Sequence, residues 1–332
     1  MTRARVLLVS PVFHGYWRSI AEALERRGYD VTTHLYDARS KAATIRHKAA
    51  RELPARIGIQ RRDDERPTAS AVAALRASHP DVVLAIRADR MQHAFWAELA
   101  GVPRSVLWLY DEVRRTAHTA ETLSAAGAIA SYSKVDVQTF QEKGLRARYV
   151  PNGFDATIAV APRPRANEVT FVGARYPNRE NLLRVLLREG VPVRAYGRDW
   201  SDHPVDRLRT WRASAIGIPN ERDVPREAAY AIMQSSTATL NPHFNQDGFT
   251  MRTFEAAGMG AVQLIDRPDV TELYEPDTEI AVFNSTEEAI ELARRALRDS
   301  AWAERIREGG RRRTLAEHTF DHRVAELEKL WQ

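Results

Sequence analysis

The sequence predicts an α/β protein made of two Rossmann-like domains that face each other across a cleft. Short apolar runs alternate with amphipathic stretches along the chain, which is typical of parallel sheets covered by helices on both faces. A segment with several Pro residues and no periodicity, 150–168, interrupts this alternation and indicates a linker. The length of 332 residues also favours two domains over one.

The first domain is expected to span 1–150. Its predicted strands are apolar runs of the usual strand length: 5–10, 31–36, 81–86, 105–110, 128–133 and the shorter 147–150. Helical stretches lie between them. In the first of these, 16–28, Ile20 and Leu24 fall on one face, and Gly28 ends the helix.

The second domain is expected to span 151–315. Its predicted strands are 168–173, 191–197, 237–242, 260–265 and 279–283. Three helical stretches close the chain: 286–299, 301–317 and 320–330. In such sheets, ligands bind beyond the carboxyl ends of the strands, so we look for chemistry there.

Composition excludes several classes of protein. Cysteine is absent, which excludes disulfides, thiolate catalysis and Cys-ligated zinc. No apolar run reaches the ~18–20 residues of a membrane span, and the N-terminus has no small-residue cleavage site of a signal peptide. We therefore expect a cytoplasmic protein with no membrane span.

The charge is modestly basic, with a formal net charge of +5 and a pI of about 9.5. The cations are overwhelmingly Arg, and acids are interspersed almost everywhere. The densest basic stretch, 46–67, also carries four acids, which favours a solvated helix or loop over a polyanion site. A nucleic acid therefore stays an open but less favoured acceptor. The sequence gives no indication of oligomeric state.

The stretch QDGFTMRTFEAAGMG places charge immediately before a helix. Asp247 and Gly248 fall in a loop, and Thr250 is the expected N-cap. The helix start favours a phosphate, and Arg252 adds a cation there. Glu255 lies three residues later on the same face. A cation for a diphosphate beside a carboxylate for ribose hydroxyls is a nucleotide-sugar arrangement; the alternative is a capped helix with an ordinary Arg–Glu pair.

Asp247 and Glu255 are separated by seven residues, and this spacing resembles a D-x7-E version of the E-x7-E motif of GT-B glycosyltransferases, particularly the retaining family 4 enzymes. VTFVGARYPNRE and YGRDW resemble the CgeB-like branch, and VPNGFD resembles the inter-domain crossing. TFDHRVAELEKL resembles the final helix, so 316–332 is expected to pack on the N-terminal domain. The resemblance implies a GT-B fold and a nucleoside diphosphate sugar, with UDP the expected nucleotide, as substrate, and no cofactor.

The resemblance also implies roles for individual residues on the donor side. Glu255 would bind the ribose, and Arg252 would lie by the diphosphate. Asp247, with the N–H groups of Gly248 and Phe249, would contact the sugar hydroxyls. The expected donor set also includes two residues that flank this loop, Asn241 and Thr250.

In family 4, the strand after the linker ends in G-R-x4-K, whose two cations grip the diphosphate. Here Gly173 is followed by Ala, Arg175 comes one place late, and Arg179 occupies the lysine position. We expect Arg179, and after it Arg175, to bind the diphosphate. Tyr196 and Gly197 end the next strand. The backbone there or the nearby Trp of YGRDW could hold the nucleobase; the alternative is a packed Trp.

In the first domain, two loops end predicted strands. SPVFHGYW contains Gly15, which suits close backbone approach to a substrate, and His14, which suggests a general base as in inverting GT-B enzymes. The alternative for His14 is an ordinary surface residue. WLYDEVRR contains Asp111 and Glu112, of which Asp111 could orient an acceptor hydroxyl or act as a base; the alternative is a helix N-cap. The expected catalytic residues are thus His14, Asp111 and Asp247.

No metal-binding pattern stands out, since the sequence lacks a DxD flanked by strand residues and a convincing His pair. We therefore expect metal-independent stabilisation of the leaving group by arginines and a helix start. The leading hypothesis is transfer of a sugar from a UDP-sugar to an unidentified small-molecule or glycan acceptor. Resemblance favours retention, whereas His14 with Asp111 would permit inversion. A UDP-sugar 2-epimerase and a non-catalytic, spore-maturation-type nucleotide-sugar-binding protein remain alternatives.

Overall fold

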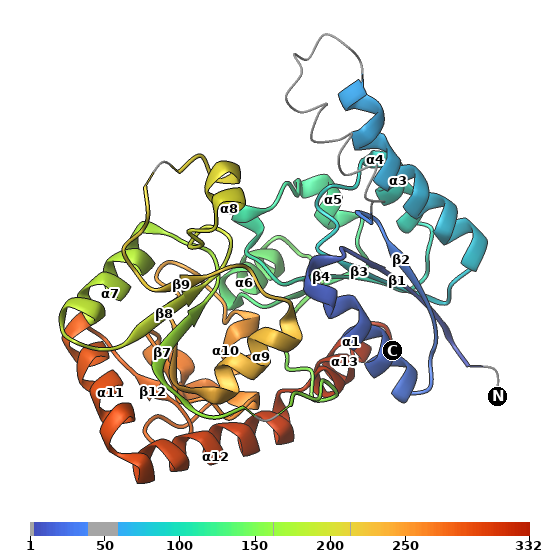
Figure 1. Ribbon diagram of the computed structural model, residues 1–332. Helices are drawn as coiled ribbons and strands as arrows, with labels where there is room; N and C mark the ends of the chain where they lie inside the picture. The colour runs from blue at the N-terminus through green and yellow to red at the C-terminus, as the bar shows by residue number, and fades with distance from the viewer. Residues whose placement is uncertain (1–2, 39–58, 162, 213) are drawn as a thin grey trace. The chain divides into compact units, whose positions relative to one another are not determined.

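The computed structural model describes residues 3–38, 59–161, 163–212 and 214–332. Most of the basic stretch 46–67 therefore lies outside the described residues. The chain divides into two compact units (Figure 1): Met1–Asn152 with Phe320–Gln332, here called unit 1, and Gly153–Thr319, here called unit 2. No helix in the described ranges is long and apolar enough to cross a bilayer.

Unit 1 contains a six-stranded, fully parallel sheet in the order β2-β1-β3-β4-β5-β6. All six predicted strands are present: β1 (Arg5–Ser10), β2 (Asp30–Leu35), β3 (Val82–Ile86), β4 (Ser105–Leu109), β5 (Ala128–Ser131) and β6 (Ala147–Tyr149). The helices are η1 (Phe13–Gly15), α1 (Tyr16–Arg26), α3 (Ile59–Ser78), α4 (His93–Leu99), η3 (Val113–Arg115), α5 (Ala120–Ser124), α6 (Lys134–Glu142) and α13 (Phe320–Glu328). The strand order reverses direction between β1 and β3, which is where such sheets bind ligands.

The end of the chain completes unit 1. Figure 1 shows α13 beside α1, and the two helices are joined by an ion pair in which Arg26 Nε lies 2.8 Å from Asp321 Oδ1. Phe320 packs against Tyr16 and Trp108, with ring centroids 6.3 and 6.4 Å away. Burial of these aromatic rings gives α13 an apolar attachment as well as a polar one.

Unit 2 contains a second six-stranded parallel sheet, in the order β12-β11-β10-β7-β8-β9. Its strands are β7 (Ala166–Val172), β8 (Val193–Tyr196), β9 (Asn220–Glu221), β10 (Ser236–Asn241), β11 (Gln263–Ile265) and β12 (Ala281–Val282). Its helices are α7 (Pro177–Arg188), α8 (Pro204–Arg209), α9 (Arg226–Ser235), α10 (Met251–Gly258), η4 (Pro268–Glu272), α11 (Thr286–Arg298) and α12 (Ser300–Glu317). The sequence did not predict β9, which has two residues and no apolar run.

The segment after Asn152 is anchored in unit 2. Phe154 donates its N–H to His318 O at 2.8 Å, and its ring stacks on Tyr230. A Cβ on Gly258 would lie 2.6 Å from the Phe154 ring, so only glycine lets α10 approach this closely. Asp155 forms a buried ion pair with Arg226 at 3.0 Å. The segment thus contacts α9 through Arg226 and α10 through Gly258, and the start of α10 carries the expected donor residues.

Candidate functional site

The start of α10 lies beyond the carboxyl end of β10, a central strand of the unit 2 sheet. Thr250 is the N-cap, as the sequence predicts. Its hydroxyl nevertheless makes no capping hydrogen bond, and its Oγ1 is buried without a partner among the described residues. The first-turn amide groups of α10 are therefore not covered by a side-chain cap, which suits a helix start that receives an anion.

A buried histidine caps the amide of the N-cap residue Thr250, which is not one of the first-turn amide groups. His243 Nδ1 lies 3.0 Å from Asn241 O, and its Nε2 lies 3.3 Å from Thr250 N and 3.2 Å from Thr253 Oγ1. Because a carbonyl oxygen only accepts, Nδ1 carries the proton, and Nε2 accepts from Thr250 and Thr253. The neutral imidazole thus fixes the first turn of α10 to the end of β10.

The loop that leads into α10 is held by Asp266 and Arg267, which directly follow β11. Asp266 accepts hydrogen bonds from His243 N at 2.6 Å and Phe244 N at 2.8 Å. Burial opposes ionisation of Asp266, but these hydrogen bonds and the His243 side chain outweigh it and hold its pKa below the usual range. Arg267 donates to the backbone oxygens of Gln246 and Asp247 at 2.7 and 2.9 Å. The expected sugar-binding loop is therefore rigidly held.

The sequence motifs do not single out His243, Asp266 or Arg267. A signal was present, because NPHF and IDR both directly follow apolar runs that end at the carboxyl edge of the same sheet. Phe249, expected to offer its N–H group, is buried, with the Arg267 guanidinium 4.5 Å from its ring centroid. Gly248 is also buried, whereas the preceding residue, Asp247, is half-buried.

Arg252 and Glu255 share one face of α10, with Arg252 Nη1 2.7 Å from Glu255 Oε2. The Glu255 side chain is 0% exposed, while that of Arg252 is 23% exposed. A buried carboxylate is costly unless it is paired and hydrogen-bonded. The fold thus keeps a charge pair near the start of this helix, where the diphosphate and ribose are expected.

Asn241 lies at the end of β10 but points inward. Its Nδ2 donates to Thr253 Oγ1 at 3.0 Å and to Gln263 Oε1 at 2.6 Å, and the residue is buried. Both amide hydrogens are thereby used inside unit 2. In this geometry Asn241 ties α10 to β10 and β11 and does not present its amide to a ligand.

The two expected diphosphate arginines are placed differently. Arg179, in the first turn of α7, donates to Ala174 O after β7 and to Pro242 O after β10, at 3.2 Å each. Arg175 is instead held by Glu180, with Nη2 2.6 Å from Oε2. Arg179 therefore lies beside the loop that leads to α10, whereas Arg175 would have to leave Glu180 to bind a phosphate.

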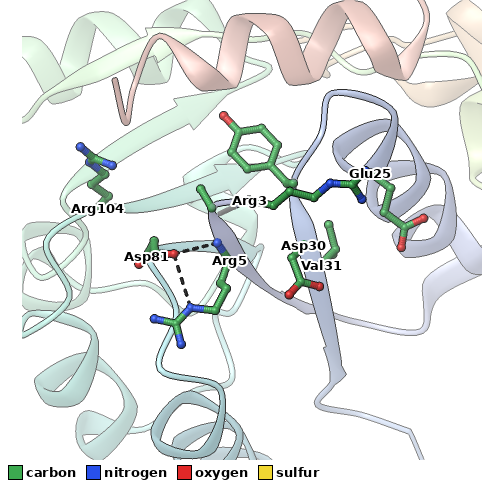
Figure 2. A pocket seen from close by; sticks show the side chains of 9 residues that line it. Arg3, Arg5, Glu25, Asp30, Val31, Asp81 and Arg104 are labelled. Atoms are coloured by element: carbon green, nitrogen blue, oxygen red, sulfur yellow. Dashed lines mark hydrogen bonds and ion pairs between the residues drawn. The ribbon is translucent and has the colours of Figure 1, made fainter. Parts of the chain in front are cut away.

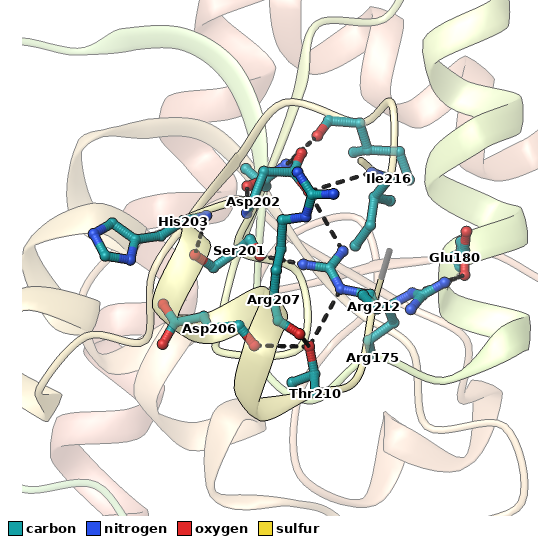
Figure 3. Close-up of polar contacts among 12 residues, drawn as sticks. Arg175, Glu180, Ser201, Asp202, His203, Asp206, Arg207, Thr210, Arg212 and Ile216 are labelled. Carbon is teal, nitrogen blue, oxygen red and sulfur yellow. Dashed lines mark hydrogen bonds and ion pairs between the residues drawn. The ribbon is translucent and has the colours of Figure 1, made fainter. Parts of the chain in front are cut away.

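Arg175 lines a hollow of about 350 Å³, together with Tyr176, Asp199, Thr210 and Arg212. Figure 3 shows the polar contacts of Arg212, whose Nε donates to Thr210 Oγ1 at 3.4 Å and whose Nη1 lies 3.5 Å from Asp202 Oδ1. The size is within the range of small-molecule pockets. Its position beyond β7 and β8 is the side of the sheet where the nucleobase is expected.

The segment YGRDW closes the end of β8 onto β7. A Cβ on Gly197 would lie 2.6 Å from Gly173 O, so glycine is required at this close approach. Trp200 is fully buried and donates its Nε1–H to Gly173 O at 2.9 Å. Of the two alternatives for this Trp, the structure therefore shows the packed one. Tyr196 is half-buried, and burial raises the pKa of its phenol.

In unit 1, the expected catalytic residues lie in loops at the carboxyl edge of the sheet. His14 is exposed and has φ 48°, and Gly15 is the N-cap of α1 with φ 73°. Asp111 follows β4; its Oδ2 lies 4.0 Å from Arg87 Nη1. Burial and then the neighbouring Glu112 raise the pKa of Asp111 to about 6. A carboxyl poised near neutrality fits an acid–base or hydroxyl-orienting role.

Unit 1 also has a larger open hollow, of about 1040 Å³, at the opposite edge of the sheet (Figure 2). Both signs of charge line it, and Asp81 accepts from Arg5 N at 2.8 Å. It lies at the amino ends of the strands, which is the edge that parallel sheets seldom use for ligands.

Among the described residues, no group of three or more His, Cys, Asp or Glu could hold a metal ion.

Comparison with known proteins agrees with this geometry. Residues 175–329, which include the whole donor-side set from Arg175 onward, match a family described as glycosyl transferase-like. The chain is also 22% identical over 293 residues to the spore protein CgeB of Bacillus subtilis (strain 168), a match that covers 80% of this chain and 87% of CgeB.

Three solved structures share the fold. A glycosyltransferase from Rickettsia africae ESF-5 is similar with a TM-score of 0.64 at 10% identity, over 100% of this chain and 98% of that one. HepE from Anabaena, solved with UDP-glucose, gives 0.64 at 12% identity, over 98% and 99%. A protein assigned as UDP-N-acetylglucosamine 2-epimerase from Listeria monocytogenes gives 0.58 at 12% identity, over 99% and 96%.

The two parallel sheets and these solved structures show the GT-B fold that the sequence predicts, and residues 175–329 match a glycosyl transferase-like family. Along most of its length the chain is similar to CgeB, at 22% identity.

Proposed function

We propose that the chain transfers a sugar from a UDP-sugar to the hydroxyl group of an acceptor. The observation that carries this proposal is the start of α10. There the Arg252–Glu255 pair follows a loop that His243, Asp266 and Arg267 hold in place. A fixed cation, a fixed carboxylate and uncovered amide groups suit the diphosphate and ribose of one ligand.

Each donor-side residue has a proposed role. Glu255 accepts hydrogen bonds from the ribose hydroxyls, while Arg252 and Arg179 neutralise the diphosphate together with the amide groups of α10. Asp247 and the neighbouring N–H groups orient the transferred sugar. The hollow of about 350 Å³ beside Arg175 would receive the nucleobase. Arginines and a helix start here take the role that a metal ion plays in other transferases.

In the proposed reaction, the acceptor oxygen bonds to the anomeric carbon while the bond from that carbon to the diphosphate oxygen breaks. The electron pair of the broken bond leaves with UDP. We favour retention, in which the hydroxyl proton passes to the departing phosphate oxygen and no protein nucleophile is needed. Inversion would send the proton to Asp111 or His14 instead. The anomeric configuration of the product, read by NMR, distinguishes the two, and an unimpaired His14→Ala enzyme would rule out His14 as base.

Calorimetry with UDP, GDP, ADP and UDP-sugars tests the proposal. We expect UDP and at least one UDP-sugar to bind, with EDTA making no difference. Arg252→Ala and Glu255→Ala should each weaken binding at least about tenfold, since each removes a charge-assisted contact. Arg298→Ala, an exposed position in the last turn of α11, is the matched control and should bind normally. If no nucleotide binds, the function is wrong; if both site variants bind normally, the site is wrong.

The second candidate is a UDP-sugar 2-epimerase, favoured by the similarity to the Listeria monocytogenes protein. Such an enzyme would invert C2 of UDP-N-acetylglucosamine without any acceptor. Incubation of that donor alone, followed by NMR, decides between them. Appearance of a C2-inverted sugar favours the epimerase. A donor that stays unchanged by itself and is consumed only after an acceptor is added favours the transferase.

A further inference from the structure

Unit 1 carries an aromatic ledge at the carboxyl edge of its sheet, formed by Phe13 and Tyr110. The two rings stack almost in parallel, with centroids 5.8 Å apart and an interplanar angle of 5°. Phe13 remains 48% exposed, and the adjacent Val12 is 41% exposed. An exposed, stacked aromatic surface of this kind loses the hydrophobic gain that burial would give, so it indicates a ligand surface.

The loops that surround this ledge contain strained backbone. His14, Arg87 and Ala88 have φ of 48°, 59° and 50°, which is the left-handed region that costs non-glycine residues free energy. They lie in the loops after β1 and β3, the two strands between which the sheet order reverses. Val12 N also donates to Asp37 Oδ1 at 2.7 Å. Strain kept at the expected ligand edge of a sheet points to binding.

Charged groups border the ledge on the Tyr110 side. The Arg87 guanidinium carbon lies 5.9 Å from the Tyr110 ring centroid, and Arg87 Nε donates to Asp89 Oδ1 at 3.0 Å. Asp111, the next residue after Tyr110, lies within 4.0 Å of the same guanidinium. A flat apolar face is thus bounded by a donor of several hydrogen bonds and by an acceptor carboxylate.

This combination matches the chemistry of a neutral sugar ring. A pyranose has a face of C–H groups that packs on the negative face of an aromatic ring, and its hydroxyls both donate and accept. A lipid chain would require a continuous apolar surface, which the charges at Arg87 and Asp111 interrupt. A phosphorylated acceptor would face the carboxylates of Asp37, Asp89 and Asp111, which repel it.

We propose that the acceptor is a neutral saccharide whose ring stacks on Phe13 and whose hydroxyls reach Asp111 and Arg87. The proposal rests on the proposed transferase function and specifies its acceptor. It also places the acceptor hydroxyl beside Asp111, the residue expected to orient it.

Saturation-transfer NMR tests the proposal on the full chain with UDP present. The probes are cellobiose and chitobiose as neutral saccharides, glycerol as an acyclic polyol, a serine-containing peptide and dodecyl phosphate. We expect the saccharides alone to show saturation transfer, with Phe13→Ala raising their dissociation constants about tenfold. Phe13→Trp should retain binding. Val135→Ala, an exposed apolar side chain on α6, is the matched control and should behave as the unaltered protein.

The proposal is overturned if no saccharide binds to protein that binds UDP, or if Phe13→Ala leaves saccharide binding unchanged. Binding of the peptide or of dodecyl phosphate in preference to saccharides would overturn it as well. UDP affinity, measured by calorimetry on the same samples, is expected to be equal in all variants. Failure of UDP to bind would instead refute the proposed function, so the two failures are distinguishable.

Discussion

Replacement of His243 by Phe removes the hydrogen bonds that hold the first turn of α10 and keeps a ring of similar size. Thr253 is fully buried and Asn241 nearly so. In the variant, the Thr253 hydroxyl hydrogen and the Asn241 carbonyl lose the partners that lie 3.2 and 3.0 Å away. Each buried polar group left without a partner costs about 1–3 kcal/mol. We therefore expect the free energy of unfolding to fall by about 2–4 kcal/mol.

The same substitution should weaken UDP binding, because Thr250 N loses its acceptor and the helix start is no longer fixed. We expect about a tenfold loss of affinity. Urea unfolding, followed by fluorescence of the buried Trp200 and Trp302, and calorimetry with UDP measure the two effects. His93→Phe, at an exposed side chain of α4, should change stability by less than about 0.5 kcal/mol. An unaltered unfolding midpoint together with unaltered UDP affinity in His243→Phe would refute the proposed capping role.

Three further results are expected. In the proposed reaction, Asp111 acts on the acceptor hydroxyl only when its carboxyl group is ionised. Because the pKa of Asp111 is raised to about 6, we expect kcat/KM to fall as the pH drops below about 6. A profile that is flat to pH about 4.5, or that Asp111→Asn leaves unchanged, would contradict this. Gly258→Ala puts a Cβ 2.6 Å from the Phe154 ring. It should lower the free energy of unfolding by about 1–3 kcal/mol, which a lower Tm would show. An unchanged Tm would mean that the Phe154 ring moves aside freely. Glu180→Gln releases Arg175 from its ion pair and should tighten UDP binding a few-fold in calorimetry, whereas weaker binding would mean that Glu180 positions Arg175 for the phosphate.

Local patterns were enough to predict most of the fold. The central strands of unit 1, β1, β3, β4 and β5, are buried along most of their length, so their apolar runs mark them clearly in the sequence. The final helix was placed by resemblance alone, because its attachment through Asp321 and Phe320 joins residues almost 300 positions apart. The short strand β9 and the helix α8 were missed, since both lie in a segment of mixed polarity with Pro and Gly and carry no clear period.

The sequence predicted that Arg252 and Glu255 lie together, but not which residues hold the loop before them. Arg252 and Glu255 are three residues apart on one helix, so helical geometry alone brings them together. The contact between His243 and Thr250, by contrast, needs a loop that turns back on itself, and Asp266 reaches that loop from the next strand. Hydrogen bonds across a loop or between strands leave no periodic trace in a sequence. The residues that position the expected donor set were therefore found only in the structure.

The most direct test of the central claim is a crystal structure of the protein soaked with UDP. We expect the diphosphate to lie within hydrogen-bonding distance of Arg252 and of the first-turn amide groups of α10. The ribose hydroxyls should contact Glu255, and Arg179 should lie beside the phosphates. UDP bound away from the start of α10, for example in the hollow at the amino edge of the unit 1 sheet, would contradict it.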